Sequence, residues 1–286
     1  MGYTDTIVRR GRYIDYKGGL PLTPGYDVVG IVDRIGPGET DLRMGDRVAD
    51  MSVAGAYSHY MIRPLETLIQ VPDGVGPKAA IEVPLMAMTG WQMLKRTAPL
   101  PPGSAVLVVG ASGAVGRPMV RLARHLGLAV IGTCSAGNIP LVERLGAIAI
   151  DHAREDLLEA IRAATDGHGV AAAFDAIGVG IWETSWAALA AGGRLIGYGF
   201  QGYLESDLPT EEARIMGLFH RTWNAEGQSD STGRSTTFYD IRERRGTHPG
   251  EYRDDATELL DMIASGALLP DEARVLHWQR RPRRIV

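Results

Sequence analysis

The stretch VLVVGASGAVGRPMV, residues 106–120, decides the fold. It begins with β-branched and apolar residues, breaks at a turn that contains Gly110, Gly113 and Gly116, and resumes with apolar residues at helical spacing. A buried strand followed by such a turn and a helix is typical of a doubly wound sheet, where the glycines let the backbone approach a pyrophosphate. The helix start adds N–H groups and a positive dipole. The alternative is a tight strand–helix turn that binds no ligand.

Apolar strand candidates and amphipathic helix candidates alternate along the chain from residue 104. The strand candidates are AVLVV (105–109), LAVIGT (128–133), AIAID (147–151), VAAAFDAIG (170–178) and GRLIGYG (193–199). Continuous apolar strands separated by helices indicate a parallel sheet that is covered on both faces. We therefore predict an α/β fold with a Rossmann-type doubly wound parallel sheet.

The segments on either side of this region follow other patterns. Short strand candidates at 27–36, 45–51, 54–64 and 67–72 predict a small antiparallel β unit, and residues 77–98 have helical spacing. Residues 217–253 are polar and predict a loop with one strand candidate, TTFYDI (236–241). A late helix is expected over 254–266, between an Asp start and a Gly stop.

Composition and charge exclude several classes of protein. The net charge of -4 argues against a nucleic-acid-binding footprint, and the RRPRR tail (280–284) is better explained as a solvated end. A single cysteine, Cys134, excludes an intrachain disulfide and a multi-cysteine zinc site. No signal-peptide core and no membrane-length apolar run is present, so we expect a cytoplasmic protein without a membrane partner.

The end of the second strand of the sheet bears on cofactor choice. A carboxylate placed there binds the ribose 2′-OH of NAD, whereas this sequence reads GTCSAGN (132–138) with no carboxylate. Ser135 and Asn138 could donate hydrogen bonds to a 2′-phosphate, so NADP(H) is favoured over NAD(H). Alternatively, Ser135 caps the next helix. The residues predicted to bind the cofactor at this turn are Gly110, Ser112, Gly113, Ala114, Val115, Gly116, Ser135 and Asn138.

Glycines also follow two later strands of the sheet. Gly178, Tyr198 and Gly199 come at the carboxyl ends of their strands, where open α/β sheets bind ligands. We include them as cofactor-binding candidates, although glycines at such places also serve plain turns.

The order and spacing of these motifs resemble one family over most of the chain. YTDTIVRRGRY (3–13), LPLTPGYDVVGIVDRIG (20–36), VPLMAMTGWQML (83–94), the glycine turn and GGRLIGYG (192–199) are similar to landmarks of the medium-chain dehydrogenase/reductase superfamily, in its zinc-independent quinone oxidoreductase branch. The resemblance implies a GroES-like β domain over 1–94, a Rossmann domain over 95–269 and a return to the β domain over 270–286. It also implies a cleft between the domains that holds the nicotinamide, and a homodimer in which TTFYDI is an edge strand.

The resemblance can be tested for zinc. Gly2 stands where zinc alcohol dehydrogenases have a cysteine, and Gly25-Tyr26-Asp27 replaces their Gly-His-Glu. Three protein ligands are needed for a catalytic zinc, so no metal is expected and Asp27 is read as structural. Without zinc to polarise a carbonyl, the acceptor should already be electrophilic: a quinone, or the double bond of an enone or enal.

The same resemblance suggests the catalytic wall. Tyr13 is a candidate donor to the acceptor oxygen, with half-buried packing as an equal alternative. Asp5 could orient a partner or water, although a structural role is favoured. Thr89 matches a helix-start threonine that lies by the cofactor in the family.

The chain also departs from the family at both ends. The resemblance implies further strands ahead of residue 3 and after about residue 272, so we expect the β domain to be incomplete. The expected function is an NADPH-dependent reductase of quinones or activated double bonds. The alternative is an NADPH-binding protein with little or no catalysis, such as a structural or RNA-associated relative or an inactive fragment. A zinc alcohol dehydrogenase is a third reading.

Overall fold

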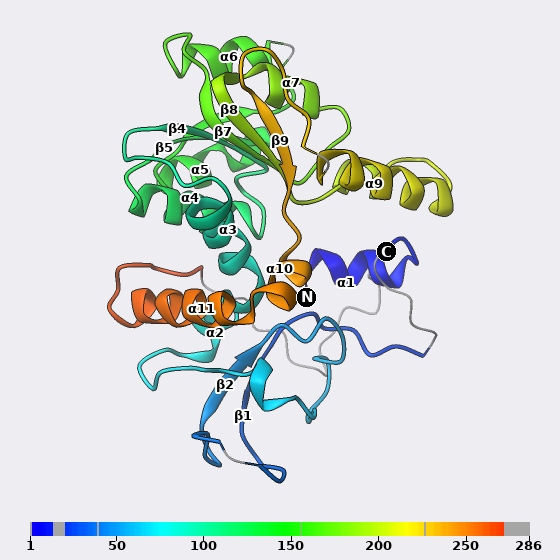
Figure 1. Cartoon of the computed structure of the whole chain (residues 1–286), viewed down its shortest axis with the longest axis vertical. Coiled ribbons are helices and arrows are strands. Elements are labelled where there is room, and N and C mark those ends of the chain that lie inside the picture. The colour runs from blue at the N-terminus through cyan, green and yellow to red at the C-terminus, as the bar shows by residue number, and fades with distance from the viewer. Residues whose placement is uncertain (1, 14–20, 39, 155, 226, 272–286) are drawn as a thin grey trace.

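The structure is a computed structural model that describes residues 2–13, 21–38, 40–154, 156–225 and 227–271. It contains a six-stranded sheet and a three-stranded sheet at opposite ends of the molecule, with helices α1 (Tyr3–Arg9), α10 (Ile241–Thr247) and α11 (Pro249–Ala264) between them (Figure 1).

The six-stranded sheet has the order β6-β5-β4-β7-β8-β9, and every neighbouring pair is parallel. Its strands are β4 (Ala105–Val109), β5 (Ala129–Cys134), β6 (Ile148–Asp151), β7 (Val170–Asp175), β8 (Leu189–Gly197) and β9 (Ser235–Phe238). The chain reverses its direction of travel across the sheet between β4 and β7, which is the topological switch point of a doubly wound fold. The predicted Rossmann-type sheet is confirmed.

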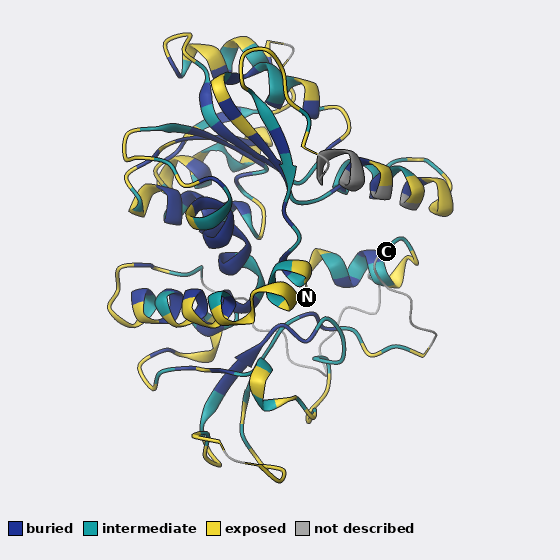
Figure 2. Cartoon of the chain, in the orientation of Figure 1, coloured by how far each residue is buried: buried dark blue, intermediate teal, exposed yellow. Residues whose placement is uncertain are grey.

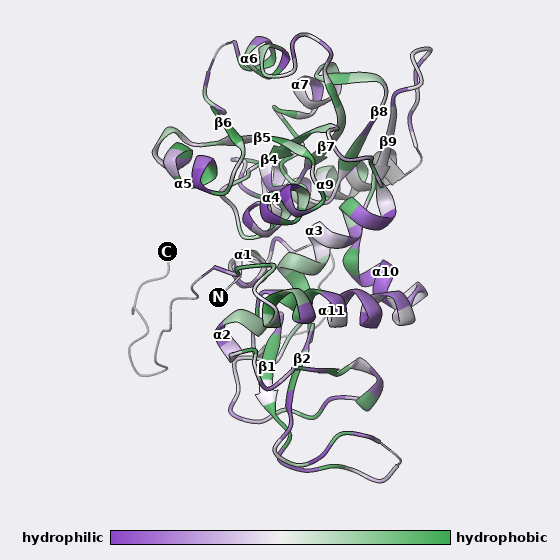
Figure 3. Cartoon of the chain, turned by 90° about the vertical axis from the view of Figure 1, so that its left-hand side faces the viewer, coloured by the Kyte–Doolittle hydropathy of each residue, from purple (hydrophilic) through white to green (hydrophobic). Residues whose placement is uncertain are grey.

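Alternate residues of the central strands enter two separate hydrophobic cores. In β4, Val106 and Val108 join the core beneath α3 (Met88–Gln92), α4 (Gly116–His125) and α5 (Ile139–Arg144). Leu107 and Val109 join the core beneath α6 (Leu157–Ala163) and α7 (Trp182–Ala187). Burial on both faces explains why these strands are apolar throughout rather than alternating (Figures 2 and 3).

The three-stranded sheet is antiparallel and contains β1 (Val28–Ile31), β2 (Arg47–Asp50) and β3 (Ile69–Gln70). The strand expected over 54–64 is wrong: this segment forms no ladder with a described strand, and a short 3-10 helix, η1 (Leu65–Thr67), follows it. Its N–H groups at 55–57 donate instead to the carbonyls of Thr23, Pro24 and Gly25. Its apolar residues Tyr60 and Ile62 are 79% and 99% exposed.

The helical region predicted over 77–98 is present but interrupted. It consists of α2 (Pro77–Ala80), the π-helical turn η2 (Val83–Ala87), α3 and a second π-helical turn, η3 (Met93–Thr97). Pro84 lacks a backbone N–H and so cannot continue a regular α-helical ladder, which accounts for the first interruption.

Helix α9 (Thr210–Ala225) corrects the loop expected over 217–253, and α10 lies in the same stretch. The described buried face of α9 includes Ala213, Gly217 and His220 rather than large aliphatic residues. A Cβ on Gly217 would lie 2.9 Å from the Phe200 ring, so the close packing requires a small residue there. A helix that buries small and polar residues gives a weak hydrophobic period, and this is why the sequence pattern failed.

The late helix is confirmed as α11, although it begins at Pro249 and not at Asp254. Helices α10 and α11 return to the first part of the chain: Arg245 donates to Asp50 of β2, and the Tyr252 hydroxyl donates to the carbonyl of Pro84. The division at 94/95 and 269/270 stays a prediction, and residues 272–286 lie outside the described residues. Among the described helices, none has the length and apolar character needed to cross a bilayer.

Candidate active site

The glycine turn between β4 and α4 can be formed only by glycine at its tightest point. Gly110 has a φ of +75°, and its carbonyl accepts from the N–H of Gly113 at 2.8 Å. A Cβ on Gly116 would lie 2.2 Å from that same carbonyl oxygen, and one on Gly113 would lie 3.0 Å from it. The chain therefore folds back on itself so closely that the first helical residue has no room for a side chain.

The open side of this turn consists of backbone. Gly113 and Ala114 are exposed, whereas Val115 packs against the core and leads into the ten-residue helix α4. The first turn of an α-helix has N–H groups without intrahelical partners, so exposed backbone at this point suits an anion. Pro118 falls in the first turn of α4, where no intrahelical donor is lost, so it does not interrupt the helix.

Ser112, Ser135 and Asn138 come together beside the turn. The side-chain amide of Asn138 donates to the hydroxyl of Ser112 at 3.3 Å and to the hydroxyl of Ser135 at 3.0 Å. Ser135 precedes the short 3-10 helix η4 (Ala136–Asn138) and makes no side-chain capping bond, which removes the capping alternative. Asn138 precedes α5 and also makes none. These three polar side chains form a cluster at the carboxyl end of β5.

A carboxylate that the linear sequence did not reveal lies near this cluster. Asp151 ends β6 and pairs in register with Cys134, the residue before Ser135. Its charge, after burial, helps to raise the pKa of the Cys134 thiol. The sequence showed no carboxylate in the residues that follow β5. Asp151 comes from the neighbouring strand, and the register that pairs it with Cys134 cannot be deduced from the sequence.

The carboxyl ends of β7 and β8 are joined through Asp175. Its carboxylate accepts from the N–H groups of Ile177 and Gly178, at 2.7 and 3.0 Å, and from the hydroxyl of Ser185. Its carbonyl accepts from the N–H of Tyr198. Burial raises the pKa of Asp175 to about 6, against the opposing effect of these donors. Sequence reasoning missed Asp175, although an acid at a strand end was a usable signal.

Gly178 and Gly199 are both close-approach positions. Gly178 has a φ of +80° and faces the imidazole of His220, 3.1 Å from where its Cβ would lie. A Cβ on Gly199 would lie 2.7 Å from the carbonyl oxygen of Ala176. His220 also contacts the ring of Trp182 edge-on, at 4.8 Å between centroids, and burial lowers its pKa. The two glycines thus hold α9 and β7 against the end of β8.

Thr89 lies on α3 and is buried, with its hydroxyl donating to the carbonyl of Leu85. The next residue, Gly90, packs against Met119 of α4, where a Cβ would lie 3.1 Å from the Met119 Cβ. The structure therefore places Thr89 beside the helix that begins at the glycine turn, with its hydroxyl proton already donated.

Tyr13, which comes after α1, contacts Tyr26, which comes before β1. Their hydroxyls are 3.2 Å apart and the rings meet edge-on, with the guanidinium of Arg242 5.9 Å from the Tyr13 ring centroid. Tyr13 also packs against the apolar cluster of Ile7, Phe200 and Leu204 that follows β8. Burial, with Tyr13 beside it, raises the pKa of Tyr26, so its hydroxyl is neutral at physiological pH. The sequence marks Tyr26 only as the replacement for a histidine, and its pairing with Tyr13 is a contact that local spacing does not predict.

Asp5 is a buried anchor of α1. Its carboxylate accepts from the N–H groups of Gly2 and Gly25, both at 2.9 Å, and from the Tyr57 hydroxyl at 2.8 Å. This geometry favours the structural reading of Asp5. Burial, together with the charge of Asp5, raises the pKa of Asp27 to about 6.

The residues at the zinc-ligand places do not fit zinc. Gly2 offers no side chain, Tyr26 directs its hydroxyl to Tyr13, and Asp27 alone does not make a site. Across the described part of the chain, no three His, Cys, Asp or Glu side chains are grouped so that they could hold a metal ion.

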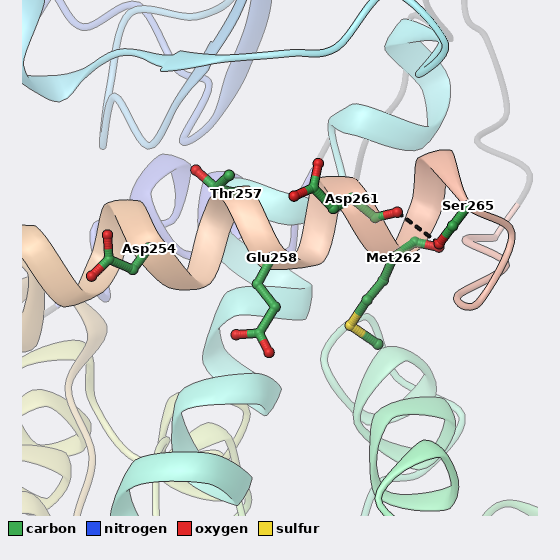
Figure 4. A pocket seen from close by; sticks show the side chains of 6 residues that line it. All are labelled: Asp254, Thr257, Glu258, Asp261, Met262 and Ser265. Carbon is green, nitrogen blue, oxygen red and sulfur yellow. Dashed lines mark hydrogen bonds between the residues drawn. The ribbon is translucent and has the colours of Figure 1, made fainter.

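A hollow beside α11 lies away from all these residues. It is lined by Asp254, Thr257, Glu258, Asp261 and Met262 of that helix and by Ser265, which directly follows it, and the Ser265 hydroxyl donates to the carbonyl of Asp261 (Figure 4). Its carboxylates form the solvated face of α11, and it holds none of the predicted site residues.

Two family models match separate parts of the chain. Residues 1–73 match the alcohol dehydrogenase GroES-like domain, and residues 114–229 match the zinc-binding dehydrogenase domain. The GroES-like prediction is thereby confirmed for the three-stranded sheet.

Named proteins show the same similarity. The chain is 35% identical over 205 residues to a 2-haloacrylate reductase of Burkholderia sp., covering 70% of this chain and 62% of that protein. It is 33% identical over 202 residues to a quinone oxidoreductase of Pseudomonas aeruginosa, again covering 70% and 62%. The chain thus spans about 62% of the length of these curated relatives.

A solved structure extends the similarity to nearly the whole chain. The quinone oxidoreductase of Escherichia coli, crystallised with NADPH, superposes with a TM-score of 0.79 at 25% identity, over 96% of this chain and 79% of that one. The motifs, the sheet order and these matches agree. The chain belongs to the medium-chain dehydrogenase/reductase superfamily, in its quinone oxidoreductase branch.

Proposed function

We propose that the protein is an NADPH-dependent oxidoreductase that reduces a quinone or an activated carbon–carbon double bond without zinc. The observation that carries this proposal is the cluster of Ser112, Ser135 and Asn138 beside a turn that admits only glycine at position 116. The relatives named above support the reaction class, because one reduces 2-haloacrylate and two are quinone oxidoreductases, one of them bound to NADPH.

The chain's own residues divide the binding task. The backbone from Gly113 to Gly116 would hold the pyrophosphate at the start of α4, and Thr89 lies beside that helix. Ser112, Ser135 and Asn138 would donate to the 2′-phosphate. Gly178, Tyr198 and Gly199 would border the nicotinamide at the carboxyl ends of β7 and β8. When bound, NADPH supplies the hydride.

Tyr13 and Tyr26 form the acceptor side of the proposed site. Because no metal polarises the acceptor, an electrophilic quinone or enone and a modest hydrogen-bond donor at its oxygen suffice. Tyr13 would donate its proton to that oxygen, and Tyr26, 3.2 Å away, would hold the Tyr13 hydroxyl in place. Solvent restores the proton. Asp5 is proposed as the residue that fixes α1, and hence this wall.

Thermal unfolding with and without each nicotinamide, followed by turnover, tests the proposal. A ligand that binds only the folded chain adds about 2.7 kcal/mol of stability at a hundred times its Kd. We expect NADPH to raise the Tm more than NADH, and a quinone or 2-enone to oxidise NADPH at a rate that Tyr13→Phe lowers. The same rate in that variant would remove Tyr13 from the mechanism.

Two further results would change the proposal. NADPH binding without turnover of any quinone, enone or enal would favour the alternative of a binding protein with little or no catalysis. Stoichiometric zinc in the purified protein would support an alcohol dehydrogenase instead. We also propose that the chain forms a homodimer through β9, which is one of the two edge strands of the six-stranded sheet.

A further inference from the structure

Arg12 joins the N-terminal segment to the residues that follow β8 of the six-stranded sheet. One terminal nitrogen of its guanidinium donates to the carbonyls of Leu204 and Ser206, at 2.8 and 2.9 Å, and the other donates to the carbonyl of Leu208 at 2.9 Å. The first of these carbonyls belongs to the last residue of α8 (Gln201–Leu204) and the other two follow that helix, 192 to 196 residues from Arg12 along the chain. A planar guanidinium suits such an array because its donors are fixed in one fork.

Other contacts bring the same two segments together. Ile7 of α1 is buried in a cluster with Phe200 and Leu204, which is packed by Tyr13. The Tyr3 hydroxyl and the Glu205 carboxylate are hydrogen bonded, which adds to burial in raising the pKa of Tyr3. Helix α1 and the segment 200–208 are therefore held by an apolar centre with polar contacts on its rim.

This contact involves both sides of the proposed site. The segment 200–208 begins directly after Tyr198 and Gly199, the residues assigned to the cofactor at the end of β8. Arg12 is the backbone neighbour of Tyr13, so a contact that fixes Arg12 also restricts the position of the Tyr13 hydroxyl. The guanidinium is half-buried and its three acceptors are backbone carbonyls, so the contact needs no second charged residue.

We propose that Arg12 is a positioning residue, whose three hydrogen bonds to the 204–208 carbonyls hold Tyr13 over the end of β8. This inference rests on the proposed function for its effect on catalysis. The contact itself does not, and it can be measured without cofactor or substrate.

Hydrogen exchange of the ligand-free full chain tests the contact. We expect amides of 201–208 to exchange at least about tenfold faster in Arg12→Met than in the wild type, because opening of this segment no longer breaks three hydrogen bonds. Arg12→Lys, which keeps the charge but not the fork, should fall between them. Arg43→Met is the matched control, since Arg43 is exposed in the loop before β2 and should leave this exchange unchanged. Unchanged exchange in Arg12→Met would overturn the contact.

A double-mutant cycle tests whether Arg12 acts through Tyr13. With a quinone acceptor, Arg12→Met should lower kcat/KM about tenfold in the wild-type background but less than about twofold in the Tyr13→Phe background. The Kd for NADPH should stay within about twofold in both, as the glycine turn is untouched. An equal loss in both backgrounds, or a matching loss in Arg43→Met, would overturn the positioning role. If the wild-type chain neither binds NADPH nor reduces a quinone, the proposed function is wrong. Faster hydrogen exchange in Arg12→Met would still establish the contact between Arg12 and the 204–208 carbonyls.

Discussion

The amide of Asn138 donates to the hydroxyl of Ser112 at 3.3 Å, and this bond joins the turn after β4 to the turn after β5. The same amide donates to Ser135 at 3.0 Å. Both hydroxyls therefore already accept from one amide, and their own protons can be directed toward a bound anion. The relation between the two turns defines where a 2′-phosphate would lie.

Ser135→Asp should reverse the cofactor preference. A carboxylate at the end of β5 repels a 2′-phosphate and accepts from a ribose 2′-OH. We expect the Kd for NADPH to rise at least about tenfold and the Kd for NADH to fall, measured by titration of the Tm shift or of nicotinamide fluorescence. Ser231→Asp adds the same charge at an exposed position and is the control. Unchanged NADPH affinity in Ser135→Asp would place the phosphate elsewhere.

Asp151→Asn should tighten NADPH binding. Asp151 is paired in register with Cys134 and so brings a negative charge to the strand beside the cluster. Its removal lowers the repulsion of a dianionic phosphate, and the effect should weaken as salt rises. We expect a gain of about threefold in NADPH affinity at low ionic strength and little change for NADH, by the same titration. Equal gains for both cofactors would mean that Asp151 does not face the phosphate.

Gly116→Ala should disrupt the turn. The added Cβ would lie 2.2 Å from the Gly110 carbonyl oxygen. The oxygen is a backbone atom and the Cβ is bonded to one, so no side-chain rotation can relieve the clash. We expect a loss of about 2–4 kcal/mol in the free energy of unfolding and a loss of NADPH binding. Gly250→Ala is the control: Gly250 lies in α11 with nothing within 4 Å of its added Cβ, and alanine there should stabilise the chain slightly. Unfolding curves in urea would compare the two variants, and a Gly116→Ala chain as stable as wild type would contradict the packing.

Local pattern was enough to predict the parallel sheet, because β4 and its neighbours are buried on both faces and read as continuous apolar runs. The glycine turn could also be predicted from local sequence, because a backbone that folds back this closely on itself leaves room only for glycine. Helix α9 could not, because Gly217 and His220 replace the large apolar residues that mark a buried helix face.

The remaining misses concern contacts between distant segments. Asp151 reaches Cys134 through strand register, and Arg12 reaches Leu204 across 192 residues. Neither partner is set by local spacing. Tyr13 was found through the family resemblance, whereas its partner Tyr26 depends on how the N-terminal segment folds back beside β1.

Asp27 and Asp175 should make the chain less stable as pH rises. Burial raises the pKa of each to about 6 from an ordinary 3.8, so the folded chain binds these protons more tightly than the unfolded chain. The free energy of unfolding should therefore fall between about pH 4 and pH 6 and then level off, as far as these two groups contribute. Chemical unfolding at pH 4.5 and pH 7.5 would measure the decline.

Asp27→Asn should remove part of that decline. Asparagine resembles the protonated acid, so the variant's gain in stability over wild type should be larger at pH 7.5 than at pH 4.5, by on the order of 2 kcal/mol. Asp175→Asn keeps an oxygen for the N–H groups of Ile177 and Gly178 and can donate to Ser185, so it should behave alike. Asp175→Ala leaves both buried N–H groups without their acceptor and should destabilise the chain at both pH values. If Asp27→Asn shows the same pH decline as wild type, Asp27 is ionised in the folded chain at pH 4.5 and its charge must be stabilised by its surroundings.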